Sequence, residues 1–373
     1  MKEKSLQEDK RIFGLDVMRA SAILMVLFSH LSFIFPMNKG IIGQITSLFG
    51  FLGVEIFFVL SGFLIGKILY EMVVLKEEFL WIDLLRFLKR RWLRTFPNYF
   101  LVLLTTVFIA KMLEYPITES WKYFFFIQNF ATPMPSFFPE SWSLSIEEFA
   151  YVLLPLFLWL GFKWMQFKSK SLLFLWIVLG LIFIFIGTKY WYFLNSDNTT
   201  LLQWNVALKA VVLYRLDSIF IGVLFSWVYF NCLKFWKQFK IVCLGFGLLF
   251  LLLMFVGVGF FAIRIETYPF FWNVLYLPIT SLAFALFLPF LSEWNKSSVL
   301  IKPITFISKI SYAIYLIHYS ILFQLMHHFF NPEQYNNGQL FGYACCYLTI
   351  TFLFSWILYR FYEKPLMDLR DKN

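Results

Sequence analysis

The sequence has 373 residues, of which 60% are hydrophobic, 23% aromatic and only 14% charged. A soluble domain is nearer half apolar and a quarter charged, so this composition predicts an integral membrane protein. The net charge of +10 requires no nucleic-acid partner, because lysines and arginines kept on the cytoplasmic side of a multi-pass protein give the same excess. The four cysteines (Cys232, Cys243, Cys345 and Cys346) form no C-x-x-C pair, so neither a metal site nor a disulfide framework is expected.

Ten stretches are apolar and long enough to cross a membrane, since about 20 helical residues span a hydrocarbon core of ~30 Å. They cover residues 13–35, 45–66, 98–113, 143–161, 172–188, 205–230, 241–263, 270–291, 304–329 and 339–360. The sequence therefore predicts an all-α integral membrane protein, a bundle of about ten transmembrane helices. We expect a single transmembrane domain over residues 1–373, with short tails at 1–12 and 361–373 and no appended soluble domain.

A different kind of segment lies between the second and third spans. Residues 75–99, LKEEFLWIDLLRFLKRRWLRTFPNY, interleave charged and apolar side chains at helical spacing. This pattern is typical of a basic amphipathic helix that lies in the membrane interface.

The lysines and arginines indicate which way the spans face. If the N-terminus is cytoplasmic, 23 of them fall in cytoplasmic segments and five in segments on the far side. Because positive residues are retained in the cytoplasm, this asymmetry predicts that both termini are cytoplasmic and that the protein is a multi-pass protein of the cell (inner) membrane.

Several ionisable side chains lie inside the predicted spans, where such groups are costly and normally face the bundle interior or a wet cavity. They are Asp16, Arg19, His30, Glu55, Glu147, Glu148, Lys209, Arg215, Asp217 and His318. Structural ion pairs between helices are the simpler interpretation, and Arg215 with Asp217 is an example. Charges in so many spans also fit a polar cavity through the bundle.

The first span has an informative spacing. Asp16 and Arg19 are three residues apart, close enough on one helix face to pair. Arg19 and His30 are eleven apart, close to three turns, so they share a face and are separated by roughly 16 Å along the axis. Arg19 is expected in the inner half of the membrane and His30 in the outer half. Histidine suits proton transfer near neutral pH, although a single histidine is more often a packing residue. His318 is the second candidate.

These residues belong to a series of motifs that resembles a known family. The series is GLD with the Arg-x10-His spacing of Arg19 and His30, GVEIFFVLSGFLI (53–65), RRWLRTFPNY (90–99), SWSLSIEEFAY (141–151), YRLDSIFIGVL (214–224), ISYAIYLIHYSI (310–321) and RFYEKPL (360–366). Together they resemble acyltransferase family 3, membrane enzymes that O-acylate extracytoplasmic glycans and lipids. Glu140 departs from the pattern, because many relatives have another polar residue or a histidine there.

The resemblance implies an acyl-CoA-dependent O-acyltransferase that uses acetyl-CoA as co-substrate and holds no permanent cofactor. The acceptor would be a hydroxyl of a cell-surface or lipid-linked glycan, such as a polysaccharide or lipopolysaccharide. Arg19 and the basic cluster of Arg90, Arg91 and Arg94 would bind the CoA phosphates, although that cluster also suits lipid headgroups.

The resemblance also implies catalytic roles. His30 would be the general base, and Glu148 would orient it and stabilise its protonated form, as a carboxylate does in hydrolytic triads. Glu147 is the alternative, because neighbours on a helix point about 100° apart and only one can face the site. Asp16, Glu55, Arg215, Asp217 and His318 are expected to have structural or site-supporting roles.

Two other functions compete with the enzyme. A proton-coupled transporter or a flippase of a glycan or lipid would also place charges inside its spans, but the sequence shows no inverted repeat. A purely structural membrane scaffold would not need so many intramembrane charges.

Overall fold

The computed structural model describes residues 11–35, 41–117, 119–165, 167–196, 200–295, 300–332 and 335–372. The protein is 82% helical, with no strand in these ranges, which confirms the all-α prediction. Nine helical segments in the described chain are long and apolar enough to cross a membrane, and a shorter apolar helix covers Leu216–Asn231. Each of the ten predicted spans overlaps one of these segments, so the chain is a multi-pass membrane protein. Residues 1–10 of the predicted cytoplasmic tail lie outside the described residues.

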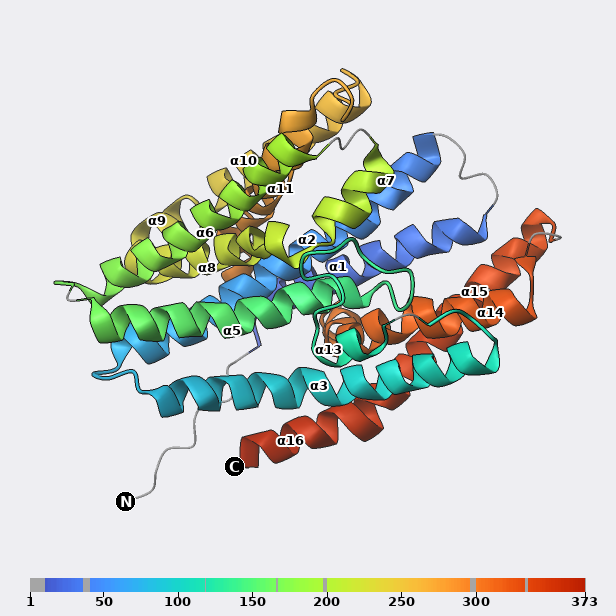
Figure 1. The fold of residues 1–373 in the computed structure, drawn as a ribbon, viewed down its shortest axis with the longest axis horizontal. Coiled ribbons are helices and arrows are strands. Elements are labelled where there is room, and N and C mark those ends of the chain that lie inside the picture. Colours follow the sequence, from blue (N-terminus) through green and yellow to red (C-terminus); the bar gives the residue numbers. More distant parts are fainter. Residues whose placement is uncertain are drawn as a thin grey trace.

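The longer helices follow one another along the chain (Figure 1). They are α1 (Phe13–Leu31), α2 (Ile41–Tyr70), α3 (Trp81–Met112), α5 (Ser141–Trp164), α6 (Lys170–Asn195), α8 (Leu216–Asn231), α10 (Lys240–Gly259), α11 (Tyr276–Ala285), α13 (Ile301–Ile317), α15 (Asn337–Leu358) and α16 (Lys364–Lys372). Shorter ones are α4 (Trp121–Phe124), α7 (Leu201–Trp204), α9 (Leu233–Gln238), α12 (Leu288–Ser292) and α14 (Gln324–Phe329). A π-helical turn, His318–Phe323, joins α13 to α14.

The amphipathic segment is helical, as predicted, but it is not a separate interfacial element. It continues through Pro97 into the third span as the single helix α3. Aromatic rings pack on both sides of the proline, since Phe96 contacts Trp92 before it and Phe100 after it, with ring centroids 5.5 Å apart in each pair.

The sixth predicted span, 205–230, is helical across the membrane only in its second part. Asn205–Lys209 is a π-helical turn, and α8 begins at Leu216. Between them lies a 3-10 turn, Val212–Tyr214, and part of the backbone also bonds to a loop. The Asn129 side chain donates to the Ala210 carbonyl oxygen at 2.6 Å, and the Val212 N–H donates to the Asn129 carbonyl oxygen at 3.0 Å. These bonds satisfy the backbone groups that the interrupted helix leaves open.

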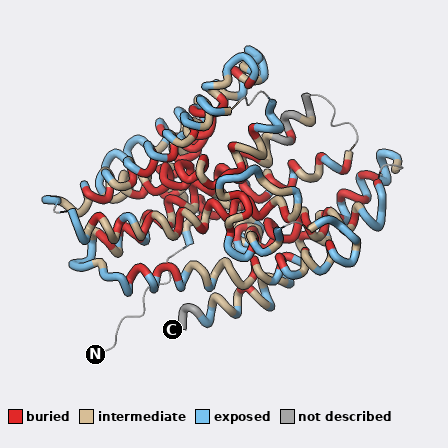
Figure 2. Tube along the Cα trace, viewed as in Figure 1, coloured by how far each residue is buried: buried red, intermediate tan, exposed pale blue. Residues whose placement is uncertain are grey.

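Helix α2 lies at the centre of the bundle, between α1 and α8. Two glycines allow the α2 and α8 backbones to touch: a Cβ at Gly62 would lie 1.9 Å from the Ile219 carbonyl oxygen, and one at Gly222 would lie 2.2 Å from the Val59 carbonyl oxygen. Small residues permit such close packing in membrane bundles. Figure 2 shows the buried residues concentrated along these central helices.

The two ends of the described chain lie at the same end of the bundle. Helix α1 begins and α16 ends toward the left of Figure 1, where α3 also begins. This arrangement agrees with an even number of crossings.

Candidate active site

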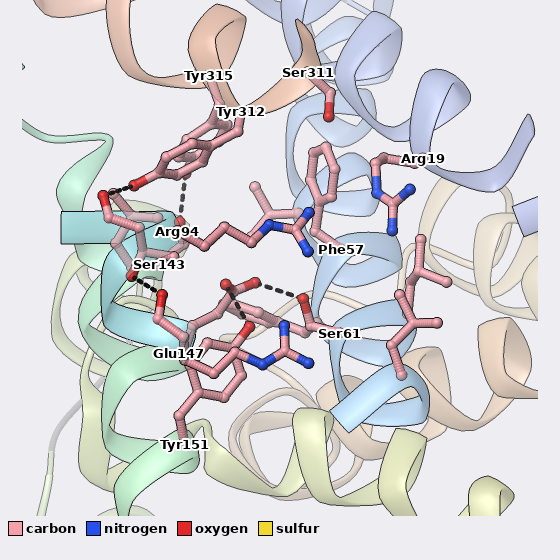
Figure 3. Close-up of a pocket in the computed structure, with 17 residues that line it drawn as sticks. Arg19, Phe57, Ser61, Arg94, Ser143, Glu147, Tyr151, Ser311, Tyr312 and Tyr315 are labelled. Carbon is pink, nitrogen blue, oxygen red and sulfur yellow. Dashed lines mark hydrogen bonds between the residues drawn. The ribbon is translucent and has the colours of Figure 1, made fainter. Parts of the chain in front are cut away.

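A cavity of about 100 Å³ lies between α1, α2, α3, α5 and α13 (Figure 3). Its lining includes three arginines, Arg19, Arg91 and Arg94, and one carboxylate, Glu147. In Figure 3 the Arg19 and Arg94 side chains extend toward each other from opposite walls. The charge of the lining is therefore positive, and the cavity is suited to an anionic ligand.

The predicted basic cluster divides between two faces of α3. Arg91 and Arg94 are three residues apart, so both point to the cavity. Arg91 also lies over the rings of Phe87 and Tyr151, at 5.8 and 5.4 Å from their centroids. Arg90 lies on the exposed face of the same helix, which places it apart from the cavity.

An ion pair holds Arg19 in its place. Asp16 pairs with Arg19 at 3.5 Å, as the spacing predicts, and with Arg11 at 2.6 Å. The Ser308 hydroxyl on α13 donates to Asp16 at 2.7 Å and accepts from Arg19 at 3.3 Å. The face of α1 that carries Arg19 therefore packs on α13.

Further along α1, His30 contacts His318 at the end of α13. The two ring centroids lie 4.8 Å apart. The same face of α1 thus carries Arg19 against Ser308 and His30 against His318, in agreement with the spacing argument. The structure brings the two candidate histidines together.

The hydrogen bonds of the two histidines define where their protons lie. Nδ1 of His318 is 2.8 Å from the Tyr315 carbonyl oxygen and 3.1 Å from the Ile314 carbonyl oxygen. Carbonyl oxygens only accept, so in the neutral ring this nitrogen carries the proton and Nε2 is an acceptor. Nδ1 of His30 faces that Nε2 at 3.2 Å and the Val26 carbonyl oxygen at 2.9 Å. Nδ1 of His30 is therefore the donor, and Nε2 of His30 keeps a lone pair.

Tyr315 connects the arginine cavity to the histidine pair. Its side chain lines the cavity, and its hydroxyl is hydrogen-bonded to that of Ser143 at 2.6 Å (Figure 3). Its ring centroid lies 5.9 Å from that of His318. The cavity and the pair are thus separated by about one aromatic side chain.

The two glutamates of α5 lie beside the arginines and not beside His30. Glu147 accepts from Ser61 at 3.0 Å and from Tyr151 at 2.9 Å, and Glu148 accepts from Thr95 at 2.9 Å. Within the described chain these bonds lead to α2, α3 and α5. The expected contact of either glutamate with His30 is therefore not found among them. Glu147 lies six residues after Ser141, the first residue of α5, which places it roughly 9 Å farther along the helix axis.

A second cluster of charges is fully buried between α2, α6 and α8. Arg215 pairs with Glu55, and Lys189 pairs with Asp217 at 2.5 Å. All four side chains have 0% exposure. The expected pairing of Arg215 with Asp217 is wrong, because Arg215 precedes α8 and points to α2 while Asp217 points to α6. Lys189 directly follows the predicted fifth span, 172–188, but lies inside α6.

Glu140, directly before α5, is buried and bonded to the turn that carries His318. Its carboxylate accepts from the Ser320 N–H at 2.8 Å and from the Ser320 hydroxyl. Burial raises the pKa of Glu140 to about 7, and the hydrogen bonds from Ser320 oppose this rise. Sequence reasoning marked this position only as a departure from a motif.

The sequence also matches known proteins. The family described as "Acyltransferase domain" (acyltransferase family 3) matches residues 12–360. The chain therefore belongs to this family of acyltransferases.

Two curated relatives are similar to the chain over different lengths. The O-acetyltransferase OatA of Staphylococcus aureus is 27% identical over an alignment of 385 positions, which covers 95% of this chain and 57% of the relative. The peptidoglycan O-acetyltransferase OatA of Listeria monocytogenes is 30% identical over 198 residues, 49% of this chain and 29% of the relative. The chain thus spans little more than half the length of the curated relatives it matches. No solved structure matches the chain significantly.

Proposed function

We propose that the protein transfers an acetyl group from cytosolic acetyl-CoA to a hydroxyl of a glycan on the far side of the membrane, with His30 as general base. The main observation in support of this proposal is the hydrogen bonding of His30 and His318, which leaves Nε2 of His30 with a lone pair. A neutral imidazole with a free lone pair can take a proton from a hydroxyl near neutral pH.

The arginine cavity supports a CoA donor. Guanidinium groups bind phosphates through paired, charge-assisted hydrogen bonds, and Arg19, Arg91 and Arg94 line one space. Its volume of about 100 Å³ is below the roughly 300–1,000 Å³ of a typical ligand pocket. We therefore assign the cavity to the phosphate-bearing part of the donor, beside its three arginines, and expect the acyl-thioester arm to extend from there along α1 toward His30. Glu147 then orients Arg91 through the shared neighbour Tyr151.

The proposed orientation in the inner membrane has both termini in the cytoplasm. The predicted split of 23 to five lysines and arginines supports it, and five becomes four because Lys189 is buried inside the bundle. Reporter fusions after Lys372 and at Arg264 test it, with a cytoplasmic signal expected at the first site and an extracytoplasmic signal at the second. Signals on the same side would contradict the orientation.

The proposed reaction is direct attack. Nε2 of His30 accepts the hydroxyl proton as the hydroxyl oxygen bonds to the thioester carbonyl carbon. The carbon–sulfur bond then breaks, and the proton on Nε2 passes to the departing CoA thiolate. Binding both reactants along one helix face supplies proximity without a moving intermediate. The alternative is an acyl-histidine on His30. Labelled acetyl-CoA without acceptor, followed by denaturation, distinguishes the two: no label on the protein is expected, and covalent label absent from His30→Ala would contradict direct attack.

The acceptor is proposed to be a glycan of the peptidoglycan type, because a similar protein is named a peptidoglycan O-acetyltransferase. Lipid-linked sugars and lipopolysaccharide are the other acceptors to test. Membranes that contain the protein should move labelled acetyl groups from acetyl-CoA to added peptidoglycan strands. A transporter or flippase would leave the glycan unlabelled, and that result would contradict the proposal.

A further inference from the structure

Glu140 joins two parts of the protein that are far apart in sequence. Its side chain is 6% exposed and belongs to the residue directly before α5. Its carboxylate accepts two hydrogen bonds from Ser320, one from the backbone N–H and one from the hydroxyl. Ser320 lies in the π-helical turn His318–Phe323, two residues after His318.

The π-helical turn explains why such an acceptor is needed. A change from i→i−4 to i→i−5 bonding leaves a backbone N–H without its α-helical partner, and an unsatisfied N–H is costly inside a membrane. Glu140 supplies the acceptor to Ser320. The Tyr347 hydroxyl, in turn, donates to the His318 carbonyl oxygen at 3.1 Å. The turn is thus held from two sides.

The position of this turn determines the position of the His318 ring. The ring donates to carbonyl oxygens of the preceding turn and presents Nε2 to Nδ1 of His30 at 3.2 Å. That contact and the Val26 carbonyl oxygen, 2.9 Å from Nδ1 of His30, both favour the His30 tautomer whose Nε2 has the lone pair. A relaxed turn would move His318 away, remove one of these two acceptors, and weaken the preference for this tautomer.

We propose that Glu140 is a positioning residue for acyl transfer: by holding the Ser320 turn it fixes His318, and His318, together with the Val26 carbonyl oxygen, favours the tautomer of His30 whose Nε2 has the lone pair. This inference rests on the proposed role of His30 as base. Glu140 does not touch the reacting atoms. Its backbone carbonyl also accepts from the Tyr315 hydroxyl at 3.1 Å, and a side-chain substitution leaves that bond in place.

Three variants separate hydrogen bonding from charge. Glu140→Ala removes both acceptors. Glu140→Gln keeps both bonds, because its amide oxygen can accept from the Ser320 N–H and its amide nitrogen can donate to the Ser320 hydroxyl. Glu140→Asp is the milder substitution for use if Glu140→Ala is not recovered folded, since it reaches about 1.5 Å less far.

The kinetic test uses the full chain in liposomes, with acetyl-CoA and peptidoglycan strands. Glu140→Ala should lower kcat by about ten- to a hundredfold, as a misplaced catalytic group does, and leave the KM for acetyl-CoA within about twofold because the arginine cavity is untouched. Glu140→Gln should stay within about threefold of wild type. An unchanged kcat in folded Glu140→Ala or Glu140→Asp would overturn the inference. Equal damage in Glu140→Gln would also overturn it, in favour of a role for the charge.

A spectroscopic test reads the tautomer directly. The chain has only four histidines, so ¹⁵N-histidine labelling gives few ring signals, and the His30→Ala spectrum assigns those of His30. In wild type and Glu140→Gln we expect His30 to show a protonated Nδ1 and an unprotonated Nε2. In Glu140→Ala the two signals should move toward each other as the tautomers mix. Identical spectra in all three proteins would overturn the inference.

The proposed function and the proposed role of Glu140 can fail separately. A fully active His30→Ala protein would overturn the proposed function, whatever Glu140 does. An inactive His30→Ala protein beside a normal Glu140→Ala protein would overturn only the role of Glu140.

Discussion

The protein buries two clusters of charge that differ in how they are balanced. In the cluster between α2, α6 and α8, each cation has an anionic partner: Arg215 pairs with Glu55, and Lys189 pairs with Asp217. In the cavity near α1 and α3, three arginines share the lining with one glutamate.

The difference separates structural charges from ligand-binding charges. Removing one member of a buried ion pair leaves the other as an uncompensated buried charge, which destabilises the fold. Ser281 and Ser218 add hydrogen bonds to the Glu55–Arg215 pair, which leaves little for a ligand to supply. The arginine cavity has a positive surplus that an anionic donor can neutralise. We infer that the first cluster holds helices together and that the second binds acyl-CoA.

Breaking the balanced cluster should have the largest effect on stability. Arg215→Gln leaves Glu55 buried without its cation, and the loss of one partner of a buried pair costs about 3–5 kcal/mol. Thermal melting and size-exclusion chromatography in detergent should show a much less stable protein. The double variant Arg215→Gln with Glu55→Gln is the matched control and should recover part of the loss. An unchanged melting temperature in the single variant would contradict the structural role assigned to the cluster between α2, α6 and α8.

Removing a cavity arginine should affect donor binding instead. Arg94→Gln takes away a charge-assisted contact worth about 1.5–3 kcal/mol, so the KM for acetyl-CoA should rise by roughly ten- to a hundredfold. The melting temperature without ligand should stay near that of wild type. Addition of CoA should raise it in wild type and not in Arg94→Gln. A normal KM would contradict the assignment of the cavity to the donor.

The geometry of Arg19 should matter as well as its charge. Arg19→Lys keeps the charge but has a shorter side chain and loses the planar guanidinium, whose Nη1 reaches both Asp16 and Ser308. We expect activity to fall by about tenfold, the equivalent of one hydrogen bond to a charged group. Steady-state kinetics on stably expressed protein measure this fall, and near-normal activity would indicate that a point charge is sufficient.

Substitution of Arg90 should have the smallest effect on the KM for acetyl-CoA, and it is a control for Arg91 and Arg94. It is the neighbour of Arg91 in sequence but lies on the exposed face of α3. Arg90→Gln should leave the KM for acetyl-CoA within about twofold of wild type, as exposed charges contribute little. A rise as large as that in Arg94→Gln would show that the exposed face also takes part in donor binding.

The contrast also explains what could be predicted from sequence. Spacing along one helix predicts which residues share a face. The common face of Arg19 and His30 and the Asp16–Arg19 pair could therefore be predicted from the sequence. The apolar spans were predictable for the same local reason, since hydropathy and length belong to each segment alone.

Partners on different helices depend on how the helices are set against one another, which one sequence does not reveal. Glu148 was expected beside His30 and instead bonds to Thr95 on α3. Lys189 was missed because it follows the predicted end of its span, although it pairs with Asp217 deep in the bundle. The neighbour of His30 is His318, 288 residues away in the chain.

The most direct test of the central claim is the rate of acetyl transfer by His30→Ala. The full-length variant and wild type are compared in liposomes with labelled acetyl-CoA and peptidoglycan strands, with His327→Ala as the matched histidine control. Removal of a general base typically costs about 10²–10⁴-fold. We expect a loss of that size in His30→Ala, with CoA-dependent thermal stabilisation retained and His327→Ala near normal. A folded His30→Ala protein that transfers acetyl groups at the wild-type rate would contradict it.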